Sequence, residues 1–131
     1  WDLKDVVEFQ KKLQNLSMYY AAITPYPGAV AYSGQVQGEA IADMGAVKCM
    51  LGIADSRESF DYELFFRSYA SLWQCKRQYS LEVSYAGSDV HPLAFLRTNV
   101  TLQQFDRFYE TFDIKKGDGM YIEPDKRIMI W

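Results

Sequence analysis

The sequence predicts a mainly α-helical fold with a single core. Apolar residues recur at three- and four-residue steps along most of the chain, the pattern of a helix with one buried face. The chain has 131 residues, of which 49% are hydrophobic and 16% aromatic, so it is the size of one ordinary domain. No repeat, low-complexity tract or linker divides it. We therefore expect residues 1–131 to form one domain.

The first predicted helix runs from Asp2 to about Ala22. Asp2 is a plausible N-cap, and Asp5 places a second carboxylate in the first turn, where the helix dipole favours negative charge. Proline and glycine then interrupt the pattern at Pro25, Pro27 and Gly28, which predicts a loop.

The second predicted helix begins near Ser33 to Gln35 and ends at about Ala54. Three glycines inside it, Gly38, Gly45 and Gly52, recur every seven residues. Because each costs about 1 kcal/mol relative to alanine in a helix, we expect a neighbouring backbone or a ligand to approach this stripe closely.

The third predicted helix opens at Ser59, with Glu63 downstream, and continues to about Tyr85. Its apolar positions carry Phe60, Leu64, Phe65, Tyr69, Leu72, Trp73 and Tyr79, and we interpret Trp73 as a packing residue, like Trp131 at the end of the chain. A turn at residues 86–89 should follow.

Two shorter helices complete the prediction. Pro92 opens one that ends at about Thr98, and Thr101 with Gln104 forms a capping box for another that ends at about Phe112. Residues 115–119 form a turn, and residues 127–131 are expected to be extended, either tucked against the body or in a minor strand.

Composition excludes several classes of partner and location. The net charge of −3 lacks the basic excess that nucleic-acid binding needs. No apolar run approaches the ~20 residues of a membrane span. Cys49 and Cys75 have no metal-site spacing, and buried free thiols are expected rather than a disulfide. The start at Trp1, without Met or a leader, suggests a fragment or a processed product.

The candidate chemistry lies in the second helix, at Glu39 and Asp43. Four residues apart, they project from one face about one turn apart, where like charges repel by a few tenths of a kcal/mol. The pair is therefore either a solvated face or a site that holds something positive. On residue type alone, the solvated face is the more common case.

Residues 38–45, Gly-Glu-Ala-Ile-Ala-Asp-Met-Gly, resemble the Gly-Glu-Asn-Ile-Ala-Asp-x-Gly-Gly signature of the neprilysin family of zinc metallopeptidases. The order of later segments is similar as well. Asp89-Val90-His91, with Arg97 and Asn99, resembles the family's Asp-x-His-Ser-Pro-x-x-x-Arg-x-Asn segment, and the end of the chain at Trp131 is also similar. The resemblance covers essentially the whole chain.

The resemblance implies a role for four residues. Glu39 would be a zinc ligand, and Asp43 would orient a ligand histidine by a hydrogen bond. His91 would stabilise the oxyanion of the tetrahedral intermediate, and Arg97 would bind the substrate's carbonyl or carboxylate. Considered alone, His91 would more commonly be a helix-start residue satisfied by backbone groups, and Arg97 a surface ion pair.

The family's His-Glu-x-x-His motif supplies two further zinc ligands and the general base, and a chain with one histidine cannot contain it. The resemblance therefore implies the helical C-terminal part of a thermolysin-like (zincin) catalytic domain from a zinc endopeptidase that hydrolyses oligopeptides. We expect the isolated chain to be inactive and to bind zinc weakly or not at all. The alternative is a non-catalytic helical interaction domain, a pseudo-peptidase.

Two further expectations follow. The remainder of the catalytic domain is the expected partner, and the isolated chain is expected to self-associate through the apolar face that this partner would cover. Family disulfide cysteines are replaced by Gln74, Ile114 and Ile128, which resembles the bacterial branch and favours a cytoplasmic location over secretion.

Overall fold

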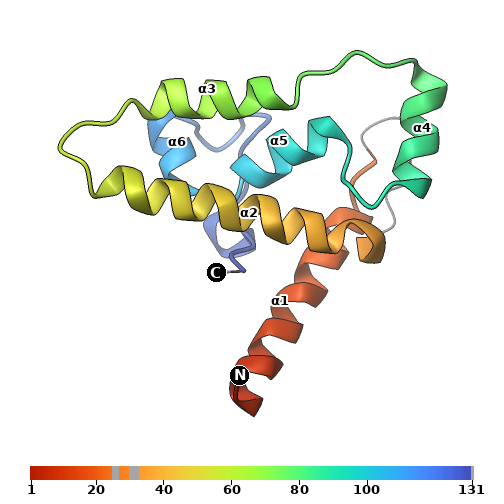
Figure 1. Cartoon of the computed structure of the whole chain (residues 1–131), viewed down its shortest axis with the longest axis horizontal. Helices are drawn as coiled ribbons and strands as arrows, with labels where there is room; N and C mark the ends of the chain where they lie inside the picture. Colours follow the sequence, from red (N-terminus) through yellow and green to blue (C-terminus); the bar gives the residue numbers. More distant parts are fainter. Residues whose placement is uncertain (25–26, 30–32, 131) are drawn as a thin grey trace.

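The computed structural model of the chain describes residues 1–24, 27–29 and 33–130, and within them it consists of helices and irregular connections (Figure 1). The elements are α1 Leu3–Ala21, α2 Ser33–Asp55, α3 Tyr62–Leu72, α4 Tyr79–Ser88, α5 Ala94–Leu102, α6 Asp106–Phe112 and the 3-10 turn η1 Pro124–Lys126. No strand occurs among these residues. The mainly α prediction is confirmed.

The helix α5 forms the centre of the molecule. It lies between the long helix α2 and the helix α3 and contacts both, while α6 packs on α3 (Figure 1). Leu96, Val100, Thr101 and Leu102 of α5 are all buried. The helix α1 contacts α2 and projects away from the body, and α4 lies at the opposite end from α6 (Figure 1). A rigid central α5 is a suitable base for a site, because burial fixes its orientation.

The first two helices follow the predicted bounds closely. Asp2 caps α1 by accepting a hydrogen bond of 2.8 Å from the backbone of Asp5, and the Asp5 side chain accepts one in return. In α2, Val47 is buried and Ile41 packs against the core, as the helical spacing requires. Pro25, which falls in the predicted loop, and Trp131 lie outside the described residues.

The predicted third helix is wrong in its extent, because the structure has two helices there. The helix α3 begins after Asp61, whose side chain accepts a 2.8 Å hydrogen bond from the backbone of Leu64, and it ends at Leu72. Residues 73–78 are irregular, and α4 begins at Tyr79. Residues 73–78 contain no proline or glycine, and the helical spacing of apolar residues continues through them. The sequence therefore gave no sign of the break.

The predicted capping box at Thr101 is also wrong. Thr101 is fully buried in α5, which continues to Leu102, and α6 begins at Asp106. The buried Gln104 instead links α5 to the C-terminal segment. Its amide nitrogen donates to the Val100 carbonyl at 2.8 Å, and its carbonyl oxygen accepts from the Ile128 backbone at 2.7 Å. The C-terminal segment is therefore tucked against the body, one of the two predicted arrangements.

Two further expectations need correction. A side chain built at Gly38 or Gly52 would meet nothing within 4 Å, so neither glycine marks a close approach in this structure. Cys49 and Cys75 are free, as predicted, but both are exposed. The expected burial of the two thiols is therefore wrong. In the described part of the chain, no helix is long and apolar enough to cross a membrane.

Candidate functional site

Two residues predicted to have separate roles, Asp43 and Arg97, form one ion pair. The Nε of Arg97 donates to Oδ2 of Asp43 and its Nη2 donates to Oδ1, each at 2.7 Å. The side chains are 14% exposed for Arg97 and 9% exposed for Asp43. Such a planar, two-bond pair between partly buried groups fixes both side chains, and the Asp43 carboxylate raises the pKa of Arg97. The pair joins α2 to the central helix α5.

Glu39 lies one turn before Asp43 and is more accessible. Its Oε2 is 3.7 Å from Nη2 of Arg97 and 3.6 Å from Nε2 of His91, and its side chain is 40% exposed. Both distances are longer than a hydrogen bond. The positive charge of Arg97 attracts the Glu39 carboxylate, and the carboxylate oxygens keep lone pairs that can bind another group. The structure thus brings all four predicted residues together at one place.

His91 lies in the connection before α5 and is held by Asp89. The Nδ1 of His91 is 2.7 Å from Oδ1 of Asp89, and the same oxygen accepts from the backbone N–H of His91 at 3.0 Å. These two contacts lower the pKa of Asp89, because they stabilise its charged form. With Nδ1 committed to Asp89, Nε2 is the nitrogen that faces Glu39.

Trp73 and Tyr69, at the end of α3, hold Arg97 from the other sides. The guanidinium carbon of Arg97 is 3.7 Å from the centroid of the Trp73 ring, a cation–π contact. Tyr69 donates to the Arg97 backbone carbonyl at 3.1 Å. Burial, followed by the charge of Asp43, raises the pKa of Tyr69 to about 12. Trp73 is therefore more than the packing residue that the sequence suggested.

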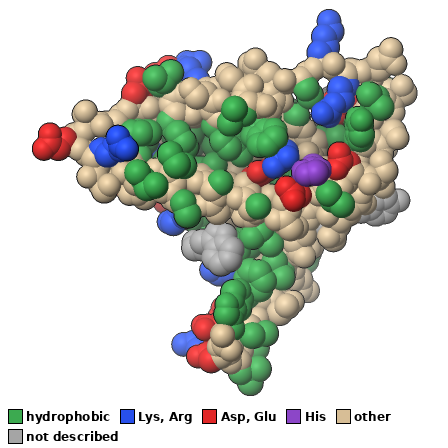
Figure 2. Space-filling model, in the orientation of Figure 1, with side chains coloured by type: hydrophobic (Ala, Val, Ile, Leu, Met, Phe, Trp, Pro, Cys, Tyr) green, Lys and Arg blue, Asp and Glu red, His purple; other side chains and the backbone are tan. Residues whose placement is uncertain are grey.

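The site lies on an open, largely apolar face. Figure 2 shows the histidine, which is His91 because the chain contains one, with acidic and basic side chains around it towards the α4 end. Apolar side chains spread over the rest of this face between α2 and α3. This face therefore has charged groups near one end and apolar groups over the rest.

The described residues do not provide a complete zinc site. No group of three His, Cys, Asp or Glu side chains among them could hold a metal ion. Structural and catalytic zinc needs at least three protein ligands, whereas in this cluster the Asp43 carboxylate is taken up by Arg97 and that of Asp89 by His91, which leaves the carboxylate of Glu39. The donor set therefore fits one ligand of a zinc site and requires the others from elsewhere.

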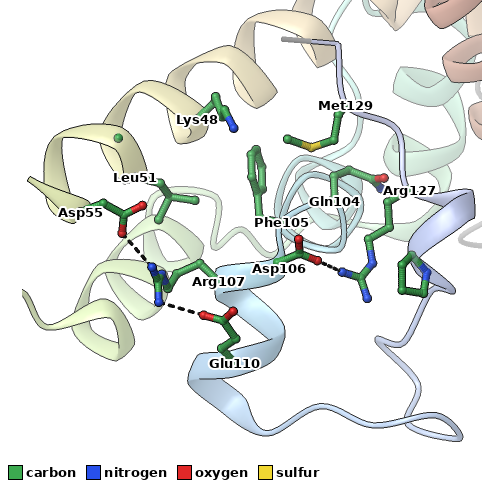
Figure 3. Close-up of a pocket in the computed structure, with 12 residues that line it drawn as sticks. Lys48, Leu51, Asp55, Gln104, Phe105, Asp106, Arg107, Glu110, Arg127 and Met129 are labelled. Atoms are coloured by element: carbon green, nitrogen blue, oxygen red, sulfur yellow. Dashed lines mark hydrogen bonds and ion pairs between the residues drawn. The ribbon is translucent and has the colours of Figure 1, made fainter.

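A separate cavity of about 350 Å³ lies between α2, α6 and the C-terminal segment and shares no residue with this cluster (Figure 3). Its charged groups are mostly paired with one another: Arg107 with Asp55 and Glu110, and Arg127 with Asp106. Because these pairs satisfy one another, we assign the cavity no role.

Comparison with known proteins identifies the family. The model of peptidase family M13 matches residues 1–128. The chain belongs to peptidase family M13. This is the neprilysin family, so the resemblance in the sequence is confirmed. A neutral endopeptidase of Lactobacillus helveticus is 32% identical over 131 residues, which are 100% of this chain and 20% of that protein.

A neutral endopeptidase of Lactococcus lactis subsp. lactis is 30% identical, again over the whole chain and 21% of that protein. This M13 chain thus spans about a fifth of the length of the curated relatives it matches. The crystal structure of Mycobacterium tuberculosis zinc metalloprotease ZMP1 in complex with an inhibitor superimposes with a TM-score of 0.87 at 24% identity, covering 100% of this chain and 22% of that one. This likeness shows that the two chains share a fold.

Sequence reasoning gave no role at the site to two residues of this cluster, Asp89 and Trp73. Asp89 could have been found, because an aspartate two residues before a histidine is in reach of that histidine's backbone and ring. Trp73 has no such local signal. Its contact with Arg97 joins residues 24 positions apart and depends on how α3 ends.

Proposed function

We propose that this chain is part of a zinc-dependent endopeptidase that hydrolyses peptide bonds in oligopeptides. The observation that carries the proposal is the gathering of Glu39, His91 and Arg97 on one open face, with Glu39 at 3.6 Å from His91 and 3.7 Å from Arg97. Family membership supports the same reaction. The chain would contribute one zinc ligand and the groups that bind the substrate.

Glu39 would hold the metal, together with ligands from a part of the protein outside these residues. A bound zinc ion supplies a Lewis acid and a water of lowered pKa. Asp43 would orient one of the histidine ligands. Each carboxylate oxygen of Asp43 accepts one hydrogen bond from Arg97, and a carboxylate has about four lone-pair sites. Asp43 therefore keeps a lone pair that can accept a hydrogen bond from a histidine.

His91 and Arg97 would bind the substrate. The Nε2 of His91 faces the Glu39 carboxylate, so in its protonated form the ring can donate to an oxyanion beside Glu39. Asp89 supports this role because a carboxylate on Nδ1 holds the ring in place with Nε2 towards Glu39. Arg97, fixed by Asp43 and Trp73, would bind a substrate carbonyl or carboxylate through the N–H groups that Asp43 does not use.

The isolated 131 residues should have no peptidase activity, because one histidine cannot supply the missing ligands and general base. The partner is then the rest of the catalytic domain. We also propose a cytoplasmic location, supported by two free and exposed cysteines, which suit a reducing compartment.

The test is to express the complete product of the reading frame that contains this chain. We expect a His-Glu-x-x-His motif upstream of Trp1 and cleavage of an internally quenched peptide that a chelator abolishes and zinc restores. A complete product without the motif and without cleavage would instead favour the non-catalytic interaction domain.

A further inference from the structure

A cavity of about 230 Å³ adjoins the proposed catalytic cluster. Its lining includes His91 and Arg97 from that cluster, Trp73 and Arg77 from the irregular connection after α3, and Tyr85 from α4. Because two of its residues also face Glu39, a peptide bound at the cluster has direct access to the cavity. The cavity is therefore placed to receive a neighbouring part of the same peptide.

The charged groups that line the cavity are not equally available. Arg97 is engaged by both oxygens of Asp43, and Asp89 is engaged by the backbone and ring of His91. Arg77 differs from them. Its ion-pair contact, from Nη1 to Oε1 of Glu82, is 3.6 Å long, which exceeds a hydrogen bond, and its side chain is 35% exposed.

The side chain of Arg77 is nevertheless held in place. Its guanidinium carbon lies 5.1 Å from the centroid of the Tyr85 ring, and Glu82 lies beside it with a side chain that is only 12% exposed. A guanidinium has five N–H donors in a fixed fork, and a planar carboxylate is its best-matched partner. Arg77 is a preformed carboxylate binder with donors to spare.

We infer that this cavity is a carboxylate-binding subsite, in which Arg77 selects peptides with a carboxylate next to the part held by His91 and Arg97. The carboxylate can belong to an acidic side chain or to the peptide's C-terminus, since both present the same two oxygens. The inference rests on the proposed function for its substrate class, and it names a specificity residue that the family resemblance did not supply.

The experiment uses the complete product of the reading frame in wild-type form and as Arg77→Gln. One peptide series carries Glu or Gln at successive positions after the cleaved bond, and a second ends in a free acid or an amide. We expect the wild type to prefer carboxylate peptides, and Arg77→Gln to reduce the ratio of kcat/KM values between carboxylate and neutral peptides about tenfold. Lys76→Gln, which removes an adjacent exposed charge, should leave the ratio unchanged.

The peptide position at which Arg77→Gln lowers the ratio of kcat/KM values shows whether the cavity binds a side-chain carboxylate or the C-terminal carboxylate. A ratio in Arg77→Gln within about twofold of wild type overturns the inference. Calorimetry with a glutamate dipeptide and its glutamine counterpart gives a second readout without turnover, in which Arg77→Gln should weaken only the former. Selective binding of the glutamate dipeptide without hydrolysis of any peptide would refute the proposed function and would still support the carboxylate-binding subsite.

Discussion

Arg97 and Asp43 connect the central helix α5 to α2 through two hydrogen bonds of 2.7 Å in one plane. The pair is less than one-sixth exposed on either side, and the Trp73 ring covers the guanidinium. Removing one partner leaves the other charge poorly solvated, which costs more than the pair contributes to stability. The pair is therefore structural as well as part of the site.

Asp43→Asn in the 131-residue chain should lower the free energy of unfolding by about 2–3 kcal/mol, because Arg97 keeps its charge and loses its partner. Urea denaturation measures this. Glu8→Gln, which removes the exposed pair of Glu8 with Lys11, is the matched control and should cost less than about 0.5 kcal/mol. Equal effects of the two substitutions would show that the Asp43 pair is not buried in solution.

The double variant Asp43→Asn with Arg97→Gln gives an independent check. Because both charges are then absent, its loss of stability should be clearly smaller than the sum of the two single losses. Additive losses would contradict a direct pair.

The stability should fall at alkaline pH because of Tyr69. Burial and the charge of Asp43 raise its pKa to about 12, whereas an unfolded tyrosine titrates near 10. Above about pH 10 the unfolded chain releases this proton and the folded chain keeps it, so the unfolded state gains stability relative to the folded state. The contribution of Tyr69 is complete below pH 10 and is lost as the pH rises towards 12.

Tyr69→Phe should therefore make the alkaline decline of the urea midpoint shallower. Tyr20 is fully buried, and burial raises its pKa as well. Its ionisation therefore also lowers the stability at alkaline pH, and this part of the decline remains in Tyr69→Phe. Tyrosinate absorbance that shows every tyrosine ionising near pH 10 in the folded chain would contradict the prediction.

The bounds of α1 and α2 could be predicted because their determinants are local. Asp2 and Asp5 form the cap within one turn, and the apolar pattern of each helix can be read from the residues of that helix alone. The end of α3 could not be predicted from the sequence. No proline or glycine lies in residues 73–78, and at the break the Trp73 ring contacts Arg97, a residue 24 positions away. Tertiary contacts of this kind override local propensity.

The site residues were predicted by family resemblance, and their arrangement was not. Asp43 and Arg97 are separated by 54 positions, so no local pattern could join them. The sequence assigned them to two partners, a histidine and a substrate, whereas in the structure they bind each other. Arg77 had no signal either, because a single arginine within a predicted helix is usually a solvated charge.

The isolated chain should self-associate through its exposed apolar side chains. Leu3 on α1 and Leu64 and Leu72 on α3 are 79%, 61% and 74% exposed, and apolar side chains spread over the face in Figure 2. Sedimentation should show concentration-dependent association that Leu3→Ser with Leu64→Ser weakens and the control Gln14→Ser leaves intact. A monomer at high concentration would contradict this expectation.

The zinc content of the complete product, with and without the Glu39 carboxylate, tests the central claim most directly. The wild type should bind about one zinc per chain, and Glu39→Gln should lose most of it, because a neutral amide is a poor zinc ligand. Glu58→Gln, at an exposed acidic residue outside the cluster, is the control and should bind zinc like the wild type. Wild-type zinc content and affinity in Glu39→Gln would contradict the account.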